Sequence, residues 1–173
     1  MTDKQKPNQT SKITQLYLDF CKEREVKPKL DEKYGCIYSI VYSAENGNIL
    51  NLTTFNDEDE YMSVYNYTTI KLAESKLLNL YKLANEINQT LSCHSLVLLP
   101  KDRKVIVKNG ASYSSILCEA GLLKDALESG VSALDQFIPA INLVNYGVMG
   151  VDKALETAER FSSTQNMEVD LPN

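Results

Sequence analysis

The stretch GCIYSIVYSAENGNILNLTTFNDEDEYMSVYNY, residues 35–67, decides the fold. Apolar and polar residues alternate with a period of two in residues 36–43, as in a half-buried strand. The pair Asn46-Gly47 follows, and it is typical of a tight hairpin because both residues tolerate positive φ. Residues 49–55 then read as the return strand, and 61–67 as a third strand after a polar acidic loop. We therefore predict a three-stranded antiparallel meander, with Gly47 as a structural turn residue.

Tyrosines are concentrated in this meander, in a chain with ten tyrosines and no tryptophan. One interpretation is that these rings form core and cross-strand contacts. The other is a partly exposed platform for a partner peptide, because tyrosine combines a large apolar ring with a polar tip. The candidate partner-binding residues are Tyr38, Tyr42, Tyr61, Tyr65 and Tyr67.

Helical periodicity appears on both sides of the meander. Apolar residues recur with helical spacing in 13–21, and Ser11 is placed to cap that helix. A second helix is predicted over 74–89 and carries Asn85 and Asn88 near its end. Asparagine satisfies loose backbone groups at helix ends. We interpret both residues as structural, tying this helix to the next strand.

The second half of the chain predicts two more strands and a long helix. Residues 94–99 form the first strand, and 104–118 form one long irregular strand that Asn109-Gly110 interrupts as a bulge or a second hairpin tip. Helical periodicity returns over 122–147. Pro139 lies inside that helix, and we expect it to kink the helix because proline removes one hydrogen bond.

A last short helix is predicted over 151–161. The resulting order is α-βββ-α-ββ-α-α, which indicates an α+β fold with an antiparallel sheet and helices packed on it. We expect residues 1–11 to be a disordered N-terminal arm, 12–161 a single α+β domain, and 162–173 a polar C-terminal tail.

Composition and charge exclude several function classes. Lys and Arg number 18 against 23 Asp and Glu, a net charge of −5. Proteins that bind nucleic acid usually carry a basic stripe, and none is visible, so we expect no nucleic-acid partner. No apolar run approaches the length of a membrane span, and no signal sequence is visible at the N-terminus. We expect no membrane partner and a cytoplasmic location.

Cysteine and histidine give no recognisable site. Cys21, Cys36, Cys93 and Cys118 form no C-x-x-C pair, and in a reducing compartment they read as small buried apolar residues. His94 is the only histidine and lies beside Cys93. Phosphate-loop and nucleophile motifs are absent from the sequence. We therefore predict no catalytic residue, no cofactor and no metal; an enzyme using Cys118 or Cys36 ranks third among the functional hypotheses.

The order of elements resembles the YbjN-domain family, whose fold is similar to that of type III secretion chaperones. The resemblance covers about residues 13–160. It rests on the opening helix before the glycine-bounded meander and on the segment Leu80-x-x-Leu83-Ala84-Asn85-x-Ile87-Asn88. It also rests on the hairpin 94–107 and on the closing helix after 121–123, which has Pro139 near its end and is followed by Gly147-Val148-Met149-Gly150 before the last helix. The resemblance implies a non-enzymatic domain that is a two-fold dimer through its second helix and the following strands.

Our first functional hypothesis is a non-enzymatic protein-interaction module, chaperone-like or adaptor-like and regulatory. It binds a partner polypeptide on the surface of the sheet and the first helix, as a homodimer without a cofactor, and it predicts an exposed apolar patch on the monomer. The alternative is a small-molecule sensor whose pocket lies between the kinked closing helix and the sheet; an enclosed cavity of at least ~300 Å³ with convergent polar groups would favour it.

Overall fold

The computed structural model of the protein describes residues 11–119 and 121–165. Its six strands form one antiparallel sheet in the order β1-β2-β3-β4-β6-β5. Helices pack on this sheet, so the predicted α+β class is confirmed. The elements are α1 (Lys12–Glu23), β1 (Lys29–Leu30), β2 (Ile37–Ala44), β3 (Gly47–Asn56), β4 (Tyr61–Thr68), the 3₁₀ helix η1 (Glu74–Lys76), α2 (Leu77–Thr90), β5 (Ser95–Leu99), β6 (Lys104–Ser112), α3 (Tyr113–Cys118), α4 (Leu122–Asn145) and α5 (Val151–Gln165).

The predicted meander consists of β2, β3 and β4. Its first turn differs from the predicted Asn-Gly turn by one residue: Ala44 pairs with Gly47, so Glu45 and Asn46 form the loop. Gly47 has a φ of +145°, whereas Asn46 is not among the residues with positive φ. The glycine is needed as the first residue of the return strand, a backbone conformation that side chains disfavour.

The structure corrects the prediction for residues 104–118. Strand β6 ends at Ser112, whose side-chain oxygen accepts a hydrogen bond from the backbone N of Ser115, and this cap starts the short helix α3. Pairing with β4 runs without interruption across Asn109 and Gly110, so neither a bulge nor a hairpin tip is present there. A Cβ on Gly110 would lie 2.7 Å from the Tyr61 ring, so the glycine allows this ring to lie against β6.

Strand β1 and the extent of α5 are further differences from the predicted order. Strand β1 has two residues, too few for an alternating pattern to be read from the sequence. Helix α5 extends to Gln165, beyond the predicted end at residue 161. Helix α1 begins as predicted, since the Ser11 side chain accepts a hydrogen bond from the backbone N of Thr14 at 3.2 Å.

The long helix α4 continues through Pro139 to Asn145. Proline has no N–H, so it leaves the carbonyl of Asp135 without its usual helical donor. Asn46 supplies one, because its Nδ2 donates to the Asp135 carbonyl at 3.2 Å and its backbone N donates to Asp135 Oδ1 at 2.9 Å. The tip of the β2–β3 hairpin is therefore attached to α4 at the proline.

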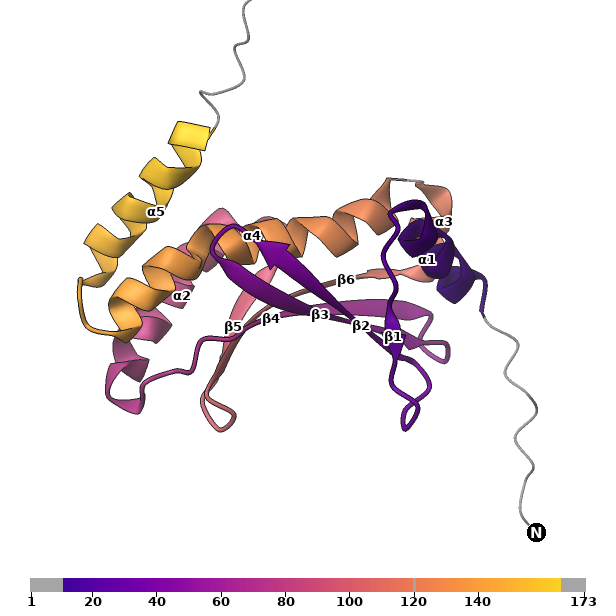
Figure 1. The fold of residues 1–173 in the computed structure, drawn as a ribbon, viewed down its shortest axis with the longest axis horizontal. Coiled ribbons are helices and arrows are strands. Elements are labelled where there is room, and N and C mark those ends of the chain that lie inside the picture. Colours follow the sequence, from indigo (N-terminus) through magenta and orange to yellow (C-terminus); the bar gives the residue numbers. More distant parts are fainter. Residues whose placement is uncertain (1–10, 120, 166–173) are drawn as a thin grey trace, which may run out of the picture.

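The helices lie on one side of the sheet, with α4 along its length (Figure 1). Buried residues there form two apolar clusters. One joins α2, the second half of α4 and α5 to the sheet, and the other joins α1, α3 and the first half of α4 to it. Helix α4 contributes to both clusters and is the element that connects them.

Candidate functional site

The face of the sheet turned away from the helices carries a band of apolar and aromatic side chains. Strand pairing places one residue from each of five strands in a single row across it, and an adjacent row runs parallel to the first. We call this surface the open face; its central rows are Val41, Leu50, Tyr67, Ile106 and Val97, and then Ser39, Leu52, Tyr65, Lys108 and Ser95.

Several apolar side chains of the open face reach solvent. Val41 is 66% exposed, Tyr61 42% and Leu50 38%. None of the described helices crosses this side of the sheet in Figure 1. A contiguous apolar surface on a single chain commonly marks an interaction site.

The middle of strand β3 departs from the usual distribution of polar and apolar residues. Leu50 and Leu52 point to the open face, whereas Asn51 and Thr53 point toward the helices and have no exposed surface. Polar residues are normally placed outside and leucines inside. At its two ends the strand keeps the usual pattern, with Ile49 and Phe55 in the core.

The structure divides the five predicted partner-binding tyrosines between the two faces. Those of β4 lie on the open face. Those of β2 face the helices: Tyr38 packs 5.3 Å from the Tyr17 ring, and burial raises the pKa of Tyr42 to about 12. The open-face group is Tyr61, Tyr65 and Tyr67, and the helix-side group is Tyr38 and Tyr42.

The charged side chains at the strand positions of the open face are all lysines. These positions carry Lys29, Lys104 and Lys108 and no carboxylate, although the whole chain is acidic. The Lys104 Nζ lies 5.5 Å from the centre of the Tyr67 ring, in cation–π contact. Burial, with smaller contributions from Tyr65 and Asp102, raises the pKa of Tyr67. The open face thus combines aromatic surface with positive charge.

A hollow of about 270 Å³ lies on this face at the β4–β6 pair. Tyr61, Tyr65 and Lys108 line it, together with Cys93 and Ser95 from the start of β5. Such a hollow can accept one side chain of a bound segment.

A buried polar network supports the open face from the helix side. Asn51 Nδ2 donates to Asn66 Oδ1 at 2.8 Å, and Thr53 Oγ1 donates to Asn51 Oδ1 at 3.0 Å. Helix α4 crosses this point with Gly130, where a Cβ would lie only 2.4 Å from Asn66 Nδ2. Sequence reasoning missed the network, because the pairing of residues 51 and 66 becomes evident only from the strand register.

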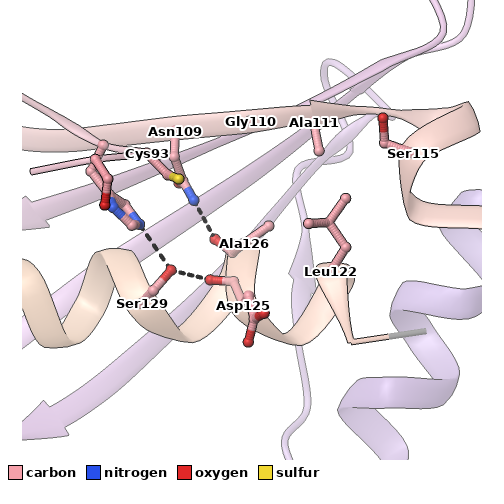
Figure 2. Close-up of a pocket in the computed structure, with 11 residues that line it drawn as sticks. Cys93, Asn109, Gly110, Ala111, Ser115, Leu122, Asp125, Ala126 and Ser129 are labelled. Atoms are coloured by element: carbon pink, nitrogen blue, oxygen red, sulfur yellow. Dashed lines mark hydrogen bonds between the residues drawn. The ribbon is translucent and has the colours of Figure 1, made fainter. Parts of the chain in front are cut away.

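A separate pocket of about 450 Å³ lies between the first turns of α4 and the end of β6 (Figure 2). Asn109 Nδ2 donates to the Ala126 carbonyl at 2.8 Å. His94 Nε2 lies 2.8 Å from Ser129 Oγ, and Ser129 in turn donates to the Asp125 carbonyl. The tautomer of His94 decides which of these two atoms donates.

Burial lowers the pKa of His94, whose imidazole lines this pocket, and so favours the neutral form of the ring. The pocket is larger than the minimum size expected of a sensor and lies between the closing helix and the sheet, but it is open to solvent rather than enclosed, and it lies at residues 122–129, well before Pro139.

The cysteines correct another expectation. Cys21 is buried, whereas Cys36, Cys93 and Cys118 are exposed. The ring nitrogen of His94 is hydrogen-bonded to a serine rather than to a thiol. The geometry of the described residues therefore offers no activated thiol for the third-ranked enzyme hypothesis.

The two asparagines of α2 have different surroundings. Asn88 Oδ1 accepts from the Leu96 backbone N at 2.7 Å, and Asn88 Nδ2 donates to the Leu96 carbonyl at 3.0 Å. This side chain links α2 to β5. Asn85 is exposed and lines a surface groove near the start of α5.

No helix in residues 11–119 and 121–165 combines the length and apolarity needed to cross a bilayer. Comparison with known sequences identifies no relative: no model of a protein family matches this chain, and no curated protein matches it. The resemblance to the YbjN-domain family therefore stays a prediction.

Among solved structures, the chain is similar to one in the crystal structure of the ExsC–ExsE complex. The two share 16% sequence identity with a TM-score of 0.49, and the match covers 72% of this chain and 92% of the other. At this identity the likeness concerns the arrangement of helices and strands alone.

Proposed function

We propose that this protein is a non-enzymatic interaction module that binds an extended segment of a partner polypeptide on the open face. The observation that carries the proposal is the row Val41, Leu50, Tyr67, Ile106 and Val97, which crosses five strands on the side that the described helices leave uncovered. Val41 and Leu50 are exposed in this row, whereas Ile106 is only 4% exposed. Aromatic residues are enriched in protein interfaces, and tyrosine is enriched among the few residues that contribute most of the binding energy.

Charge defines the chemistry of the partner segment. The open face offers lysines and no carboxylate at its strand positions, so a partner with acidic side chains gains favourable contacts and a basic partner does not. Its apolar side chains would cover the leucines of β3 and enter the hollow beside Tyr65. The expected partner segment is therefore both apolar and acidic.

Binding to a permanently unfolded acidic protein tests this proposal. Reduced, carboxymethylated α-lactalbumin carrying a fluorescent label serves as the probe in an anisotropy titration. We expect the substitution Tyr65→Ser to weaken binding at least tenfold. Tyr146→Ser is the matched control, because Tyr146 is 73% exposed and lies outside the sheet.

Circular dichroism spectra that match the wild type verify that both variants are folded. Equal binding by the Tyr65→Ser variant and the wild type would refute the assignment of the open face. Weaker binding by the Tyr146→Ser variant, with Tyr65→Ser unchanged, would place the binding surface at the helical end of the molecule.

A sensor function is the second candidate, favoured by the 450 Å³ pocket that His94 lines. Native mass spectrometry of the purified protein tests it: a retained small molecule should be lost when Ala126→Phe fills the pocket. An adduct of the same mass in both proteins, or no adduct in either, would count against the sensor.

The proposal also includes a homodimer and a cytoplasmic location. Sedimentation equilibrium measures the first and fractionation of the source cell the second. If the protein is strictly monomeric, the proposed homodimer is wrong. The open face of each single chain would then be the binding site of one partner segment.

A further inference from the structure

Residues 167–171 have the sequence Met-Glu-Val-Asp-Leu, in which apolar and acidic side chains alternate strictly. Resting on the proposed function, we infer that this segment of one copy binds the open face of a second copy. Residues 167–171 would thus be a ligand, within the protein itself, for the same open face that binds partners.

The chemistry of the segment matches that of the open face. In an extended chain, alternate side chains point to opposite sides. Met167, Val169 and Leu171 therefore form one apolar edge, suited to the leucines and tyrosines of the open face, while Glu168 and Asp170 remain available to lysines. Lys104 and Lys108 on β6 are exposed and can bend toward a bound strand.

Reach within one chain argues for a second copy. Helix α5 has 15 residues, so it carries the chain about 22 Å from its start, where Ala154 is buried against the core. Only residue 166 lies between α5 and the segment, and residues 166–171 together span at most about 22 Å when fully extended. They reach no further than about the length of α5, whereas the open face lies on the far side of the sheet from the helices (Figure 1).

Two consequences follow from binding between copies. Self-association depends on protein concentration, and any partner must compete with the segment for the same surface. An interface held by lysine–carboxylate contacts at its rim also weakens as salt is added.

A charge-exchange experiment on the full chain tests the inference. Sedimentation equilibrium gives the self-association constant of the wild type, of a face variant (Lys104→Glu, Lys108→Glu), of a segment variant (Glu168→Lys, Asp170→Lys) and of the combined variant. We expect each double substitution to weaken association at least tenfold. The combined variant should regain most of the wild-type constant, because the charges are again complementary.

The inference is overturned if the wild type does not self-associate, or if the segment variant associates as tightly as the wild type. Labelled α-lactalbumin then separates this failure from failure of the proposed function. If the segment variant binds the probe and Tyr65→Ser abolishes that binding, the open face still binds polypeptide. Only the binding of residues 167–171 to the open face of a second copy is then wrong. If the wild type neither self-associates nor binds the probe, both ideas fail together.

Discussion

Replacing Gly130 by alanine should destabilise the protein, although helix propensity alone predicts the opposite. Gly130 lies inside α4, and a glycine-to-alanine exchange in a helix interior is worth about 1 kcal/mol in favour of folding. In this structure the new Cβ would lie 2.4 Å from Asn66 Nδ2, well inside contact distance. Asn66 has no exposed surface, so it has little room to move away.

The size of the effect follows from the network beneath the helix. Displacing Asn66 breaks its hydrogen bond with Asn51 and leaves a buried donor and a buried acceptor unpaired, at about 1 to 3 kcal/mol for each group. After subtraction of the propensity gain, we expect a net loss of about 2 kcal/mol. For a chain of this size that corresponds to a fall in Tm of about 4 to 8 °C.

Urea denaturation at neutral pH measures this loss. Gly150→Ala is the matched control, since a Cβ there meets no atom within 4 Å; its effect should stay within about 0.5 kcal/mol. In an Asn66→Ala background the same Gly130→Ala exchange should become neutral or stabilising, because the contact is gone. A Gly130→Ala protein as stable as the wild type would show that the close approach of α4 to the network is not a constraint.

Three further outcomes are expected. Asn46→Ala should cost about 0.5 to 1.5 kcal/mol in urea denaturation, because it leaves the Asp135 carbonyl without its side-chain donor; an unchanged midpoint would contradict the attachment of the hairpin to α4. Burial lowers the pKa of His94, so the unfolded chain binds a proton more readily; stability should fall as pH drops below 6.5, and His94→Gln should remove that part of the dependence in thermal scans. Tyr113→Phe should cost about 1 to 2 kcal/mol, because the hydroxyl donates to the Asp57 carboxylate at 2.8 Å, and equal stability of variant and wild type would refute this contact.

Local sequence signals predicted most of the fold. The period-two stretches became β2, β3 and β4, the two long helices fall close to their predicted limits, and the Ser11 cap is present. These features depend on residues close together in the chain. The misassigned segment 113–118 shows the limit of such signals: it is rich in β-prone residues, yet the Ser112 side chain caps it as a helix.

The candidate site could be predicted only in part, because it depends on which face of each strand meets the helices. Shared parity placed the β4 tyrosines on one face, which the structure retains. The relation between β2 and β4 was not available from either strand alone. It follows from the turn: with Ala44 opposite Gly47, Tyr42 pairs with Ile49 on the helix side, while Leu50 pairs with Tyr67 on the other.

Register in this sheet cannot be fixed by hydrophobic pattern, because both faces of β3 carry apolar residues. A slip of one residue would turn Leu50 and Leu52 inward but Ile49 and Phe55 outward, so burial of apolar surface alone does not decide between the two registers. The buried pair of Asn51 and Asn66 opposes that slip. Moving either residue to the other face breaks their mutual hydrogen bond and leaves the carbonyl of Val107, 3.5 Å from Asn66 Nδ2, without this contact. The buried asparagine pair thus helps to fix the register that leaves Leu50, Leu52 and the β4 tyrosines on the open face.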